Sequence, residues 1–129
     1  MKPKLILLFT RDSNFAQSVS EALFGTKAVV LMARSVADAL QIVCQRGREL
    51  AFALLDFDDG CRGMTLLSAV HGCYERLPIV VTTSRDAEHA NAVAYANGAR
   101  ACLNKPILAA ALADTMGKLS QPDRRLAAA

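Results

Sequence analysis

Short apolar segments alternate with amphipathic segments along the whole chain. Runs such as Leu5–Phe9 are continuously apolar and are followed by polar residues, a pattern typical of strands buried on both faces. Between the runs, apolar residues recur at helical spacing. The pattern predicts strands at Leu5–Phe9, Val29–Met32, Ala51–Leu55, Ile79–Thr82 and Ala101–Leu103. It predicts helices between Asp12 or Ser13 and Gly25, between Ser35 and Gly47, and over Met64–Cys73, Asp86–Asn97 and Ile107–Leu119.

Five strand–helix repeats with short connections predict the fold class directly. Right-handed crossovers are the rule for such units, so the strands form a parallel sheet with helices on both faces. We therefore expect a doubly wound α/β domain over residues 1–119. The remaining residues, 120–129, contain Pro122 and three terminal alanines, and we interpret them as a linker stub or an expression remnant.

Composition and charge exclude several classes of protein. With 53% hydrophobic and 21% charged residues, the chain is expected to have a packed core. No apolar run approaches the roughly 20 residues of a membrane span, and none resembles a signal peptide. The 15 Lys and Arg residues are interleaved with 12 acidic residues, which argues against a nucleic-acid-binding face. The four cysteines show no C-x-x-C spacing. We expect a cytoplasmic protein that binds neither membranes nor nucleic acid.

Polar residues follow several of the predicted strands. In a doubly wound sheet, the ligand or reaction site lies beyond the carboxyl ends of the strands. The residues found there are Thr10-Arg11-Asp12, Asp56-Phe57-Asp58-Asp59, Thr82-Thr83-Ser84 and Asn104-Lys105-Pro106. These segments contain the candidate functional residues.

The order of these pieces resembles the receiver domain of two-component response regulators, over about residues 4 to 119. The resemblance is carried by Leu54-Leu55-Asp56, by Leu77 to Ser84, and by Gly98-Ala99 followed by Lys105-Pro106-Ile107. It implies the flavodoxin-like strand order 2-1-3-4-5, with Asp56 as the phosphoacceptor. It further implies that Thr83 contacts the phosphoryl group and that Lys105 is its ion-pair partner, preceding a cis peptide bond to Pro106.

The chain departs from this family where a cation should bind. Family receivers hold Mg²⁺ with an acidic pair after the first strand, but Thr10 and Arg11 occupy those positions. Hard cations need oxygen ligands, and a guanidinium cannot supply them. We predict that Arg11 pairs with Asp56 as an internal counter-ion, that no cofactor is bound, and that Mg²⁺-dependent phosphorylation is disabled. A one-residue slip of the loop would instead bring in Asp12, leaving Asp12, Asp56 and Asp58 as candidate Mg²⁺ ligands.

Two further departures point to an atypical receiver, or pseudo-receiver. The loop after Asp56 lacks the family's proline and is one residue short, so we expect it to be reshaped. The aromatic residue that switches in the family is replaced by Cys102. Two readings of Asp56 stay open at this stage: a structural ion network with Lys105 and Arg11, or phosphorylation retained by some route.

The functional hypothesis is a non-enzymatic signalling module that acts by protein–protein interaction, with a histidine kinase or an output domain as partner. Its Ala-rich fourth and fifth helices suggest a homodimer or partner contact through the fourth helix, fifth strand and fifth helix. One alternative is a functional receiver phosphorylated on Asp56 by a histidine kinase. A second is a small phosphatase similar to haloacid dehalogenases, suggested by Asp56-Phe57-Asp58, although Gly60 does not fit that motif.

Overall fold

Five strands and five α-helices alternate in the computed structural model, which describes residues 4–58, 62–84 and 87–119. The elements are β1 (Lys4–Phe9), α1 (Ser13–Ala22), β2 (Ala28–Ala33), α2 (Val36–Arg46), a 3₁₀ turn η1 (Gly47–Glu49), β3 (Leu50–Asp56), α3 (Arg62–Cys73), β4 (Ile79–Thr83), α4 (Ala87–Ala96), β5 (Ala101–Asn104) and α5 (Ala109–Leu119). No helix in these ranges is long and apolar enough to cross a membrane.

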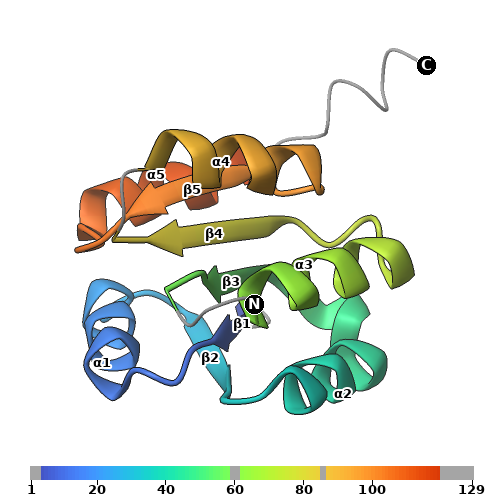
Figure 1. The fold of residues 1–129 in the computed structure, drawn as a ribbon. Helices are drawn as coiled ribbons and strands as arrows, with labels where there is room; N and C mark the ends of the chain where they lie inside the picture. The colour runs from blue at the N-terminus through green and yellow to red at the C-terminus, as the bar shows by residue number, and fades with distance from the viewer. Residues whose placement is uncertain (1–3, 59–61, 85–86, 120–129) are drawn as a thin grey trace.

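The strands form one parallel sheet in the order β2-β1-β3-β4-β5, which confirms the predicted fold class and strand order. β3 occupies the centre between β1 and β4, and all three strands are almost completely buried. β2 lies at one edge, where Val29 and Met32 are exposed. All five carboxyl ends therefore lie along the same side of the sheet, where the polar segments follow (Figure 1).

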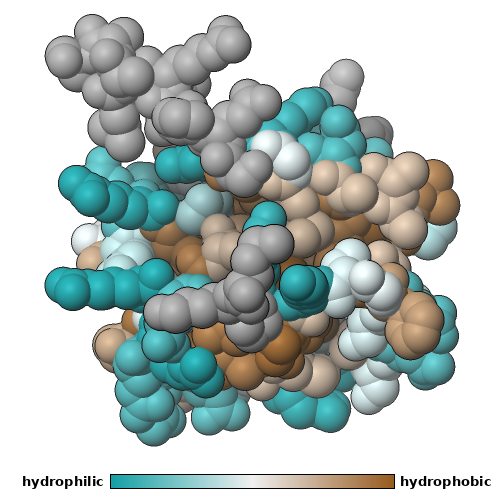
Figure 2. All heavy atoms as spheres, turned by 180° about the vertical axis from the view of Figure 1, so that it is seen from behind, coloured by the Kyte–Doolittle hydropathy of each residue, from teal (hydrophilic) through white to brown (hydrophobic). Residues whose placement is uncertain are grey.

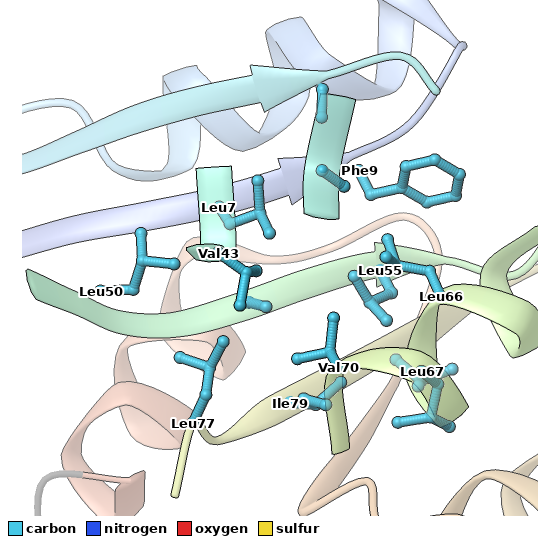
Figure 3. Packing of buried hydrophobic residues seen from close by; sticks show 14 of the residues in the cluster. Leu7, Phe9, Val43, Leu50, Leu55, Leu66, Leu67, Val70, Leu77 and Ile79 are labelled. Atoms are coloured by element: carbon cyan, nitrogen blue, oxygen red, sulfur yellow. The ribbon is translucent and has the colours of Figure 1, made fainter. Parts of the chain in front are cut away.

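Two hydrophobic clusters cover the two faces of the sheet. One joins alternate residues of the central strands to α2, α3 and α4, through side chains such as Val43, Leu66 and Val70 (Figure 3). The other joins the intervening strand residues to α1 and α5, through Phe15 and Leu112 among others. Because successive strand residues point to opposite faces, continuous apolar runs are needed to supply both clusters. This requirement explains the strand pattern in the sequence.

Helix ends agree closely with the sequence signals. The Asp12 carboxylate accepts hydrogen bonds from the backbone N–H groups of Asn14 and Phe15, which caps α1. Gly25 has a φ of 85°, as expected where the chain must leave a helix. Gly47 differs, because its helical backbone leads into the 3₁₀ turn. α5 begins at Ala109, two residues later than predicted. The predictions for Asp86 and for residues 120–129 lie outside the described residues.

Candidate functional site

Asp56, the last residue of β3, is the centre of a buried polar cluster. It is only 2% exposed, and both of its carboxylate oxygens accept hydrogen bonds. Oδ2 accepts from the Thr10 hydroxyl at 2.7 Å, and Oδ1 accepts from the Asp58 backbone N–H at 2.8 Å and from Lys105 Nζ at 3.0 Å. Burying a carboxylate is costly unless it is paired and hydrogen-bonded. These three donors provide that environment.

Lys105 lies between two carboxylates. Its Nζ is 3.0 Å from Asp56 Oδ1 and 3.0 Å from Asp58 Oδ2, and it stands 4.1 Å from the centre of the Phe15 ring. Burial alone would lower the pKa of the Lys105 ammonium. The hydrogen bonds and charges of the two carboxylates have a larger, opposite effect, so the pKa of Lys105 lies above its usual value. Lys105 is therefore a fixed cation. The predicted pairing of Lys105 with Asp56 is confirmed, as is the cis peptide bond to Pro106.

Asp58 holds a second group of donors at the ends of β4 and β5. Its Oδ1 accepts from the Thr83 hydroxyl at 3.2 Å, and the Ser84 backbone N–H reaches Oδ1 and Oδ2 at 3.0 and 3.1 Å. Burial alone would raise the pKa of the Asp58 carboxyl, but the Ser84 amide and the Lys105 ammonium outweigh it and lower the pKa to about 2. Asp58 thus links Thr83 to Lys105.

The predicted pairing of Arg11 with Asp56 is wrong. Arg11 is exposed, and its backbone carbonyl accepts a hydrogen bond from Arg34 at 3.4 Å. The side chain that turns inward is that of Thr10, whose backbone N–H still bonds to Ala33 at the end of the β1–β2 pairing. Thr10 therefore continues the strand into the site, whereas Arg11 follows after the chain has left the sheet. Lys105 neutralises Asp56 instead.

The donors at this site do not fit the Mg²⁺ ion that an acidic receiver pocket would hold. The Asp12 carboxylate caps α1 instead of facing Asp56, so the one-residue slip does not occur. Asp56 and Asp58 are both paired with Lys105, which already supplies a positive charge there. Across residues 4–58, 62–84 and 87–119, no three acidic, His or Cys side chains are grouped as a metal site. A hard cation would have to displace the ammonium from both carboxylates, and it would find no acidic side chain at Thr10 or Arg11.

The Cys102 position of β5 contains an aromatic contact that the sequence did not suggest. Tyr95 of α4 lies close enough to Cys102 for the two groups to influence each other's pKa. Burial raises the pKa of the Cys102 thiol and that of the Tyr95 hydroxyl. The loop predicted to be reshaped runs from Asp56 to Gly63, and residues 59–61 within it lie outside the described residues.

The low pKa of Asp58 predicts how stability depends on pH. An unfolded Asp58 has an ordinary pKa of 3.8, whereas the folded value is about 2. Its stabilising effect is therefore complete above about pH 4 and is lost as the pH falls toward 2. We expect the free energy of unfolding, measured by urea denaturation, to fall more steeply between pH 4 and 2 in the wild type than in Asp58→Asn. Parallel pH profiles for the two proteins would contradict the assignment.

No protein-family model matches the sequence, and no curated protein matches it. Solved structures do match. A response regulator from Chloroflexus aurantiacus J-10-fl is 25% identical, with a TM-score of 0.82, over 92% of this chain and 98% of that one. The bacteriophytochrome response regulator RtBRR is 26% identical, with a TM-score of 0.76, over 94% and 80%. The signal receiver domain of an HD domain-containing protein from Pseudomonas fluorescens Pf-5 is 21% identical, with a TM-score of 0.81, over 92% and 88%.

These structures agree with one another on the architecture. Each covers at least nine tenths of this chain, and each is a response regulator or a signal receiver domain. The sheet order and the five helices around it are also those of the CheY-like, flavodoxin-like fold. The chain has the fold of response regulator receiver domains.

Proposed function

We propose that this protein is a receiver-like signalling module of a two-component or phosphorelay system that works by protein–protein interaction, without Mg²⁺-dependent phosphorylation. The receiver fold supports the signalling class. The observation that carries the proposal is the complete engagement of Asp56, whose two carboxylate oxygens accept hydrogen bonds from Thr10, Asp58 and Lys105. The site is built to satisfy a buried carboxylate.

The chemistry of phosphoryl transfer explains why this engagement matters. A carboxylate nucleophile must present an oxygen to the phosphorus, and the charge of the transferring group must be neutralised. Thr10 donates to the Oδ2 atom that is not bound to Lys105, so each oxygen already accepts at least one hydrogen bond. The one cation that contacts Asp56 among the described residues is Lys105, and two carboxylates already share it. A phosphoryl group on Asp56 would disturb these contacts, and Thr10 and Arg11 stand where an acidic pair would hold a compensating metal.

Without phosphorylation, partner binding would depend on the side chains at the protein surface. One solved neighbour is the receiver domain of a larger HD domain-containing protein, and we propose that this chain likewise serves a histidine kinase or an output domain in the cytoplasm. Hydrophobic side chains interrupt the hydrophilic surface (Figure 2). Tyr95 of α4 and Leu108, just before α5, are 52% and 67% exposed. They suit a partner or homodimer contact through α4, β5 and α5.

The proposal is tested by the intact mass of the protein after incubation with acetyl phosphate and Mg²⁺. We expect no gain of a phosphoryl group in the wild type or in Asp56→Asn, with circular dichroism showing that both proteins are folded. A phosphoryl mass gained by the wild type and absent from Asp56→Asn would overturn the proposal. That result would identify a functional receiver phosphorylated on Asp56.

A further inference from the structure

Three hydrogen-bond donors converge on one point at the carboxyl edge of the sheet. They are the Thr83 hydroxyl at the end of β4, the backbone N–H of Ser84 directly after it, and the Lys105 ammonium just beyond β5. A hydroxyl, an amide and a cation aimed at the same position form the donor set that proteins use for oxyanions. In this chain, the anion that occupies the position is the carboxylate of Asp58.

Asp58 is held by contacts on both of its oxygens. Oδ1 accepts from Thr83 and Ser84, and Oδ2 accepts from Ser84 and Lys105. The side chain is 21% exposed and that of Lys105 is 14% exposed, so solvent screens this pair only weakly. Because Asp58 lies two residues beyond β3, it reaches the donors at a small cost in chain entropy and at a high effective concentration.

We propose that the Asp58 carboxylate occupies the place of an oxyanion among the Thr83, Ser84 and Lys105 donors. It thereby holds these segments in the same positions that a bound oxyanion would. This inference rests on the proposed function. If the protein takes no phosphoryl group, Asp58 supplies the anion that holds the segments after β4 and β5 in place. Two anions cannot share the same three donors without strong repulsion. A dissolved oxyanion therefore binds only when the Asp58 carboxylate is removed.

Inorganic phosphate is the probe that tests this inference. We expect Asp58→Ala to bind phosphate at least tenfold more tightly than the wild type, measured at pH 7 by the chemical shifts of the Thr83 and Ser84 amides in ¹⁵N-labelled protein. Adding Thr83→Val to Asp58→Ala should remove most of that gain, because one of the three donors is lost. Should Asp58→Ala fail to fold, Asp58→Asn removes the charge with little change of shape and is expected to show a smaller gain.

The matched control is Asp114→Ala, which changes the net charge equally but removes an exposed carboxylate paired with Lys118 on α5. Equal phosphate affinity in Asp58→Ala, Asp114→Ala and the wild type would overturn the inference, as would shift changes that avoid Thr83 and Ser84. This failure is distinguishable from failure of the proposed function. The latter would appear as a phosphoryl mass on wild-type Asp56, whatever Asp58→Ala binds.

Discussion

Replacing Lys105 by alanine is expected to lower the free energy of unfolding by about 3–5 kcal/mol, the range for removing one partner of a buried ion pair. The change leaves Asp56, 2% exposed, without its cation, and it also removes a charge from Asp58 and from the face of Phe15. Urea unfolding at pH 7 gives the measurement. Loss of one cation thus leaves a buried charge uncompensated.

Arg11→Ala is the matched control for this experiment. Both changes remove one positive charge, but Arg11 is exposed, so its loss should cost less than about 0.5 kcal/mol. Combining Lys105→Ala with Asp56→Asn should recover part of the lost stability, because the buried position is then neutral. A cost below about 1 kcal/mol for Lys105→Ala, or a large cost for Arg11→Ala, would show that the charge of Asp56 is balanced differently.

Gly63→Ala is expected to destabilise the protein by about 1–3 kcal/mol, the range for overpacking a filled interior. Gly63 is buried in the first turn of α3. A Cβ atom there would lie 2.6 Å from a ring carbon of Phe57 and 2.8 Å from the backbone oxygen of Asp56. The ring can move aside, but the backbone cannot do so without shifting the Asp56 segment. We therefore expect the amide shifts of Asp56 and Asp58 to change as well.

Gly72→Ala, in the same helix, provides the comparison. A Cβ placed at Gly72 would meet nothing within 4 Å beyond its own stretch of helix, and Gly72 is exposed near the end of α3. Alanine there gains helix propensity and should stabilise the protein by up to about 1 kcal/mol. If both substitutions had the same effect on urea unfolding, the close packing of α3 against the Asp56 segment would be refuted.

The fold could be predicted because its signals are local and repeated. Apolar runs define strands that must be buried on both faces, and the helix between each pair enforces the parallel arrangement. The cap of α1 at Asp12 was one of two predicted positions, and the structure selects it. α2 also ends at the predicted residue, Gly47, but this glycine keeps helical backbone and packs against Tyr74 instead of turning the chain.

The site was predicted only in part, and the error has a clear physical origin. Asp56 and Thr83 end β3 and β4, and Lys105 directly follows β5, so their meeting at one edge follows from the topology. Whether Thr10 or Arg11 turns inward depends on where β1 stops pairing, and the apolar pattern ends at Phe9. The strand pairing extends one residue further than that pattern, through the Thr10 N–H. This extension places a neutral hydroxyl beside Asp56.

The role of Asp58 was missed for a different reason. Asp58 was predicted only as a candidate metal ligand, although its spacing from Asp56 contained a signal. Residues two apart in extended chain point to the same side, so both carboxylates could reach a cation beyond β5. What spacing could not show is that the donors of Thr83 and Ser84 face Asp58. That contact depends on how the ends of β3 and β4 lie together.

The apolar edge strand β2 also bears on how copies of this protein behave toward one another. The six residues of β2 include no charged residue and no proline, and only one side of the strand is paired, with β1. An edge of this kind can template the addition of a strand from another chain. Lys27 and Arg34, both exposed, stand at its two ends. Antiparallel pairing of two such edges would bring cations together, so their repulsion protects the sheet from edge-to-edge aggregation, and salt weakens that protection.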